Sequence, residues 1–126
     1  MFDGLGQNQP NHRKDHWLRY RGAPTPWPCL LEATYESAMC IELQEAGLKF
    51  QCQPIFPAVY KGKTIGEYRP DLLVDSVVVE IKSVERFDKV FEAQVLTYLR
   101  ITGTRVGLLI NLHSRFLRDG IHRYIL

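Results

Sequence analysis

Long apolar runs, Gly-rich loops and net charge are scarce in this sequence of 126 residues, and each shortage excludes a class of protein. No run approaches the ~18 apolar residues of a membrane span, and the N-terminus lacks the apolar segment of a secretory signal. We therefore expect a cytoplasmic protein with no membrane partner. No Gly-rich phosphate loop is present, which argues against an enzyme for small phosphoesters. The net charge of +2 gives no support to tight, charge-driven wrapping of DNA.

Cysteine is also rare, with only Cys29, Cys40 and Cys52 in the chain. The number is odd, no C-x-x-C pair is present, and two of the three fall in a helix or strand pattern. We predict buried free thiols rather than a disulfide or a zinc site.

The composition predicts one small domain over residues 29–126, since 45% of the residues are apolar and can bury a single core. Residues 1–28 are punctuated by Gly and Pro and carry no helical period, so we expect a poorly ordered N-terminal segment. This segment has four basic and two acidic residues, while the remaining 12 of each sign cancel. Its charges, beside Trp17, Tyr20 and Trp27, suit either a phosphate backbone or an ordinary solubilising tail.

Two apolar segments in the middle of the chain predict a β-hairpin. Residues 68–74 read as one strand and residues 77–82 as the next, with a two-residue turn between them. A turn of that length places Asp71 directly opposite Glu80. Because side chains alternate between the faces of a strand, Lys82 shares a face with both carboxylates, and their apolar neighbours occupy the other face.

The two carboxylates of this hairpin need a partner of positive charge. Opposed residues have Cβ atoms ~4.5 to 5.5 Å apart, and two like charges at that range repel by up to ~4 kcal/mol near a protein surface. A divalent cation bound between Asp71 and Glu80 removes this cost. Arg69, on the same face, also relieves it, so the hairpin alone leaves open both a metal site and a solvated, charge-balanced face.

The pattern along the whole chain predicts a mixed central sheet flanked by helices. We expect a helix at 30–46 ended by Gly47, strands at 48–53, 65–74 and 77–83, a helix at 88–102, strands at 105–111 and 121–125, and a small hairpin turned by residues 61–63. Three consecutive strands between helices, followed by a returning strand, define an α/β (α+β) fold in the order α-β-β-β-α-β.

Both predicted helices carry polar residues whose positions need an explanation. In the first, Glu32 and Glu36 stand one turn apart as a like-charge pair, and we assign Glu36 and its later acidic neighbours, Glu42 and Glu45, to a solvated face. In the second, Gln94 falls within an apolar stripe and must find a partner or cost ~1 to 3 kcal/mol. The region of Lys82 is one available partner, and a boundary glutamine facing water is the alternative.

Several ordered motifs resemble a known family. The segment CLLEATY at 29–35 is similar to the G-x-x-E-x-x-Y signature of the GxxExxY group of proteins. The segments GEYRPDLLV at 66–74 and VEIKS at 79–83 resemble the core of the PD-(D/E)xK nuclease superfamily, in which that group is placed. The likeness continues in EAQVLTYL at 92–99, GLLIN at 107–111 and DGI at 119–121, and so spans about residues 29 to 125.

This resemblance implies a restriction-endonuclease-like core and a nuclease that depends on Mg²⁺ or Mn²⁺. Asp71 and Glu80, with Glu32 directly or through water, would hold the ion, because hard divalent cations prefer carboxylate and water oxygens. Lys82 would orient the attacking water or stabilise developing negative charge. Gln94 would help to position the phosphate or the nucleophile.

The resemblance also leaves a second function open. Cys29 stands where the signature has glycine, and residues 1–28 lack the apolar helix that the family usually has there. A catalytically silent nucleic-acid-binding or protein-interaction module that retains the fold is therefore the alternative. The sequence does not distinguish DNA from RNA as the nucleic-acid partner, and it leaves open a homodimer, the state in which nucleases that cut both strands often act.

Overall fold

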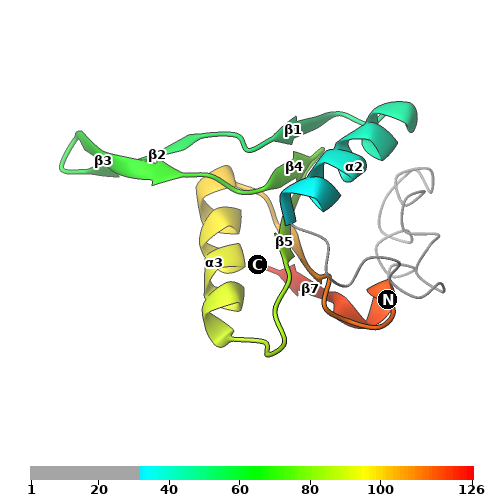
Figure 1. The fold of residues 1–126 in the computed structure, drawn as a ribbon. Helices are drawn as coiled ribbons and strands as arrows, with labels where there is room; N and C mark the ends of the chain where they lie inside the picture. Colours follow the sequence, from blue (N-terminus) through cyan, green and yellow to red (C-terminus); the bar gives the residue numbers. More distant parts are fainter. Residues whose placement is uncertain (1–31) are drawn as a thin grey trace.

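The computed structural model describes residues 32–126, so the predictions for residues 1–28 and for Cys29 lie outside it. The elements, in chain order, are α2 (Glu32–Glu45), β1 (Phe50–Cys52), β2 (Phe56–Tyr60), β3 (Lys63–Tyr68), β4 (Leu72–Val74), β5 (Val77–Lys82), α3 (Lys89–Thr102), β6 (Val106–Asn111), the 3₁₀ turn η2 (Leu117–Gly120) and β7 (Ile121–Ile125). Figure 1 shows their arrangement. Within these residues, no helix is long and apolar enough to cross a membrane.

Five strands form one mixed sheet in the order β1-β4-β5-β6-β7. β5 and β6 are parallel, and the other neighbouring pairs are antiparallel. The parallel pair is joined through α3, as the crossover of a parallel connection requires. The prediction of a mixed central sheet flanked by helices is confirmed.

The two faces of the sheet carry separate apolar clusters. On one face, Val79 and Ile81 of β5 pack in a cluster with Met39 and Leu43 of α2. On the other face, Val78 packs in a second cluster with side chains of α3. β5 therefore lies between two helices, which is why every residue from its start up to Ile81 is buried.

Capping residues mark the ends of both helices, and Gly47 after α2 is the cap that the sequence predicts. Gly47, with φ of 70°, follows α2, and its N–H donates to Gln44 O over 3.0 Å. Asp88 precedes α3, and its side chain accepts a hydrogen bond from the Val90 N–H at 2.9 Å. Gly103 closes α3 in the left-handed conformation. These caps satisfy main-chain groups that would otherwise lack partners.

The prediction of one continuous strand over residues 65–74 is wrong. The chain leaves β3 after Tyr68 and enters β4 at Leu72, because Pro70 has no N–H to give to a ladder. β3 pairs instead with β2 in a separate two-stranded sheet, turned by Lys61 and Gly62 at positive φ as the hairpin prediction requires. Figure 1 shows this β2–β3 arm projecting well beyond the five-stranded sheet.

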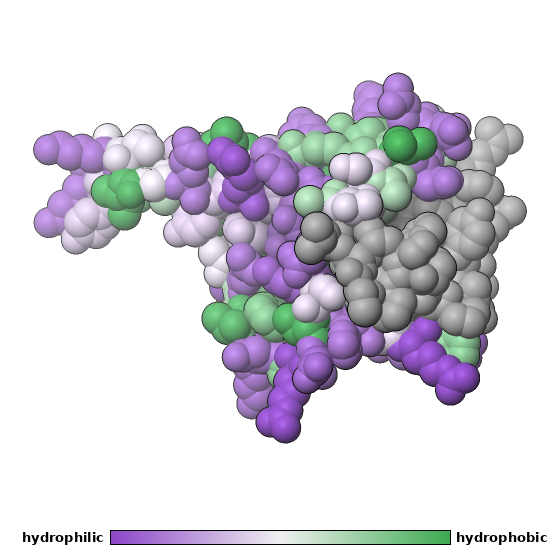
Figure 2. Space-filling model, in the orientation of Figure 1, coloured by the Kyte–Doolittle hydropathy of each residue, from purple (hydrophilic) through white to green (hydrophobic). Residues whose placement is uncertain are grey.

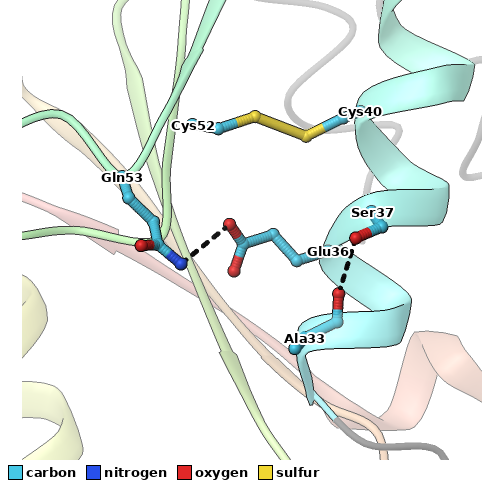
Figure 3. The surroundings of a disulfide bond; sticks show 6 residues. All are labelled: Ala33, Glu36, Ser37, Cys40, Cys52 and Gln53. Carbon is cyan, nitrogen blue, oxygen red and sulfur yellow. Dashed lines mark hydrogen bonds between the residues drawn. A yellow bond between two sulfur atoms is a disulfide. The ribbon is translucent and has the colours of Figure 1, made fainter.

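The prediction of buried free thiols is also wrong for the described cysteines. A disulfide joins Cys40 of α2 to Cys52 of β1, and Cys52 is exposed (Figure 3). The two residues are 12 positions apart in the sequence, and they meet because α2 packs against β1. An odd number of cysteines and the absence of a C-x-x-C pair therefore could not reveal that Cys40 and Cys52 meet in the fold.

Candidate active site

Asp71, Glu80 and Lys82 lie on the face of the sheet that α3 covers. The antiparallel register of β4 and β5 pairs Leu72 with Val79, so Asp71 and Glu80 come next along the two segments, where the Asp71 N–H donates to the Glu80 carboxyl. Val78 of β5 packs with α3 side chains, and alternation along the strand puts Glu80 and Lys82 on the same side. Glu80 is only 2% exposed, so a carboxyl group is buried in the layer between the sheet and the helix.

Each carboxyl of this pair holds the main chain of the opposite strand. The Asp71 N–H donates to Glu80 Oε1 over 2.8 Å, and the Ile81 N–H donates to Asp71 Oδ2 over 2.8 Å. An ionised acceptor such as Asp71 shortens and strengthens such a bond. The two side chains are therefore fixed against each other rather than free to turn toward solvent.

Burial and mutual repulsion set the protonation of the pair. Burial, followed by the negative charge of Asp71, raises the pKa of Glu80 to about 8. Burial also raises the pKa of Asp71. A hydrogen bond between the two side chains raises the pKa of Glu80 and lowers that of Asp71. Glu80 is therefore the partner that carries a proton at neutral pH.

Lys82 supplies the nearest positive charge. Against the larger effect of burial, its ammonium lowers the pKa of both Asp71 and Glu80. Its Nζ also lies 5.2 Å from the centre of the Phe91 ring of α3, a distance at which a ring face attracts a cation. The ammonium is thus held on the side of the carboxyl pair where α3 begins.

Glu32, at the start of α2, belongs to the same neighbourhood but has a different partner. Its Oε1 accepts a hydrogen bond from the Ser83 N–H at 2.9 Å, which ties α2 to the residue after β5. Its negative charge still reaches Asp71, where it adds to the rise in pKa that burial dominates. Glu32 therefore lies close enough to influence the charge of Asp71, but its own hydrogen bond is to the main chain at Ser83.

Glu36 is a site residue that sequence reasoning missed. It is half-buried rather than on a solvated face, and Gln53 Nε2 donates to its Oε1 over 3.3 Å (Figure 3). Burial, then the negative charge of Asp71, raises the pKa of Glu36. The only sequence signal was its position one helical turn after Glu32.

Gln94 finds a hydrogen-bond partner within its own helix. Its Nε2 donates to the Tyr98 hydroxyl over 3.1 Å. Tyr98 is 8% exposed, and burial, then the charge of Glu80, raises its pKa. The two residues therefore form a polar pair on α3 within electrostatic reach of Glu80.

The donor set suits a hard divalent cation, although no group of three or more His, Cys, Asp or Glu side chains gathers to hold one anywhere in residues 32–126. Mg²⁺ is commonly held by only one or two carboxylates together with waters and substrate phosphates. Asp71 and Glu80 approach closely enough to share a proton, and a cation competes with that proton for the same oxygens. These two side chains would hold the ion.

A mixed sheet whose central hairpin carries an aspartate opposite a Glu-x-Lys sequence defines a nuclease-like fold and site. The chain belongs to the PD-(D/E)XK nuclease superfamily, whose family model matches residues 26–124. This match does not separate the GxxExxY group within the superfamily. No curated protein and no solved structure matches the chain.

Proposed function

We propose that this protein is a nuclease that hydrolyses phosphodiester bonds of DNA or RNA with Mg²⁺ or Mn²⁺, acting through Asp71, Glu80, Lys82, Glu32 and Gln94. The observation that carries this proposal is the buried, proton-sharing pair of Asp71 and Glu80 beside an ammonium. We also propose that the protein belongs to the GxxExxY group within the superfamily, because Glu32 lies at the start of α2. The proposal includes a homodimer and a cytoplasmic location, where the disulfide between Cys40 and Cys52 would be reduced.

The acidic, basic and amide side chains of the site have different proposed roles. Asp71 and Glu80 bind the cation, and Glu32, through its hold on the Ser83 N–H, fixes the chain after β5. When bound, the divalent ion supplies polarisation of the phosphate and activation of water. The ammonium of Lys82 orients the attacking water or neutralises charge that develops on the phosphate oxygens. Gln94 positions the phosphate or the nucleophile from the α3 side.

Cleavage assays with Mn²⁺ on single- and double-stranded DNA and RNA test this proposal. We expect the wild type to cut at least one substrate and Lys82→Ala to lose about 10² to 10⁴-fold of the rate, the usual contribution of a positioned acid or base. Lys49→Ala, which removes an exposed lysine next to β1, is the matched control and should cut normally. Equal rates for the two variants would separate any activity from this site.

A catalytically silent module is the second candidate, and one observation favours it. The described residues hold no ready group of three potential ligands, and each carboxyl of the pair already binds a main-chain N–H. In this alternative, Asp71 and Glu80 serve only to hold β4 against β5 through their hydrogen bonds to the main chain. Mg²⁺ and Mn²⁺ would then leave the melting temperature unchanged, whereas a bound ion raises it by mass action.

A further inference from the structure

The β2–β3 arm is an exposed structure with no evident role in the core. It is a two-stranded sheet without a third strand, and such hairpins are marginally stable alone in water. Three large apolar side chains on it are at least 60% exposed, namely Val59, Tyr60 and Ile65. Figure 2 shows the arm standing out from the body, with hydrophobic atoms between hydrophilic ends. Such exposure marks a surface that binds a partner.

The charge of the arm is positive at its tip. Lys61 and Lys63 flank the turn at Gly62, and the Lys61 Nζ lies 5.5 Å from the centre of the Tyr60 ring. The arm's acidic residue near its base, Glu67, pairs with Arg69 over 3.4 Å. The two lysines at the far end are therefore left as an excess of positive charge, which suits phosphates.

The arm leads directly into the candidate active site. β3 ends at Tyr68, and Asp71 follows three residues later through Pro70, which is buried. Tyr68 also packs edge-on against Tyr98, with ring centres 6.5 Å apart, so the base of the arm contacts α3. A ligand held along the arm consequently extends away from Asp71.

We infer that the β2–β3 arm enters the major groove of double-stranded DNA and holds a duplex at the candidate active site. This inference rests on the proposed function, because it takes nucleic acid as the substrate and narrows its class. The major groove of B-DNA is ~12 Å wide and admits a two-stranded β-ribbon, and exposed apolar side chains contact thymine methyl groups there. The major groove of A-form RNA is too deep and narrow for side chains to read.

A second copy of the chain is a less suitable partner for the β2–β3 arm than duplex DNA. Two arms meeting at their tips would bring four lysines together. Lys63 also lies at the start of an edge strand, and a lysine on such an edge discourages the addition of another strand. The lysines instead complement the phosphates that line both sides of the groove.

Fluorescence anisotropy of labelled duplex DNA, duplex RNA and single-stranded DNA in EDTA tests the inference. We expect the double variant Lys61→Ala/Lys63→Ala to bind duplex DNA more weakly and to lose about 1.8 from the slope of log affinity against log salt, since each phosphate contact contributes about 0.9. Arg115→Ala/Arg118→Ala removes two exposed charges outside the arm and should leave the slope unchanged. Ile65→Asp should weaken duplex DNA binding while the protein keeps its oligomeric state in sedimentation.

Three outcomes would overturn the inference: an unchanged salt slope in the lysine variant, an equal loss for all three nucleic acids, or a change of oligomeric state in Ile65→Asp. The last outcome would make the arm an interface between copies of the chain. Because binding in EDTA requires no cleavage, the test is independent of the nuclease proposal. An inactive wild type that still binds duplex DNA through the arm would contradict only the proposed catalysis.

Discussion

Glu80 and Asp71 hold each other's strands, with Glu80 Oε1 accepting from the Asp71 N–H and Asp71 Oδ2 accepting from the Ile81 N–H, both over 2.8 Å. The same two side chains repel each other as charges, and burial raises the pKa of each. The pair therefore stabilises the hairpin through its acceptors and destabilises it through its charge. Substitutions that keep the acceptor and remove the charge separate these two effects.

At pH 9, where Glu80 is ionised, Asp71→Asn should stabilise the metal-free protein by about 1 to 2 kcal/mol, because the amide oxygen can still accept from the Ile81 N–H while the repulsion between two charged carboxylates is gone. The same variant should lose the rise in melting temperature that Mn²⁺ gives the wild type. Thermal unfolding with EDTA and with Mn²⁺ measures both effects. Glu45→Gln, at an exposed position of α2, is the control and should behave as wild type. A variant with unaltered metal-free stability and an intact Mn²⁺ response would contradict this account.

The stability of the metal-free protein should fall as the pH rises from about 4.5 to about 8. The folded-state pKa of Glu80 is about 8 against an ordinary value of 4.5, so the folded state keeps a proton that the unfolded state releases in this window. The stabilising contribution is complete below the lower value and is lost by the upper one, a change on the order of 5 kcal/mol. Urea unfolding at pH 5 to 9 in EDTA, with Glu80→Gln alongside, tests this. If the slope persists in Glu80→Gln, another group is responsible.

Binding of Mn²⁺ at neutral pH should release about one proton, since Asp71 and Glu80 share a proton that the cation displaces. Calorimetric titration in buffers of different ionisation enthalpy counts the released protons. The count should approach zero at pH 9, where Glu80 is already ionised. Binding without proton release at pH 7 would mean that the ion binds elsewhere.

The sequence predicted the parts of the site that depend on local rules. A two-residue turn fixes the register of a hairpin, and the structure pairs Leu72 with Val79 in that register and brings Asp71 and Glu80 together one residue beyond it. The end of α2 followed from a glycine at the capping position, Gly47. These features depend on contacts between residues close together in the chain.

The parts that were wrong or missed depend on packing between distant segments. Glu36 comes near Asp71 because α2 lies along the sheet, and the same packing brings Cys40 to Cys52. Gln94 and Tyr98 are one turn apart in α3, so their hydrogen bond is local, but the approach of Tyr98 to Glu80 depends on how α3 packs on the sheet. No periodicity or spacing in a single sequence encodes which surfaces meet.

The disulfide between Cys40 and Cys52 should stabilise the fold by about 3 kcal/mol, the entropy expected for closing a loop of 12 residues in the unfolded chain. Reduction, or the variant Cys40→Ser/Cys52→Ser, should lower the urea midpoint accordingly. Thiol labelling before and after reduction checks the bond directly. Two free thiols at these positions in the oxidised, folded protein would contradict the pairing.

Gly107 determines how closely α3 approaches β6. A Cβ at this position would lie 2.6 Å from Val95 Cγ1 and 3.3 Å from Leu99 Cδ2, so Gly107→Ala should destabilise the protein by about 1 to 3 kcal/mol. Gly66→Ala is the matched control, because its nearest neighbour atom is 4.0 Å away. Adding Val95→Ala to Gly107→Ala makes room for the methyl group and should recover part of the loss. Because α3 also carries Tyr98, whose pKa responds to the charge of Glu80, the single variant should lower any nuclease rate and the double variant should restore it. Full stability of Gly107→Ala in urea unfolding would show that the helix can move away from the sheet without cost.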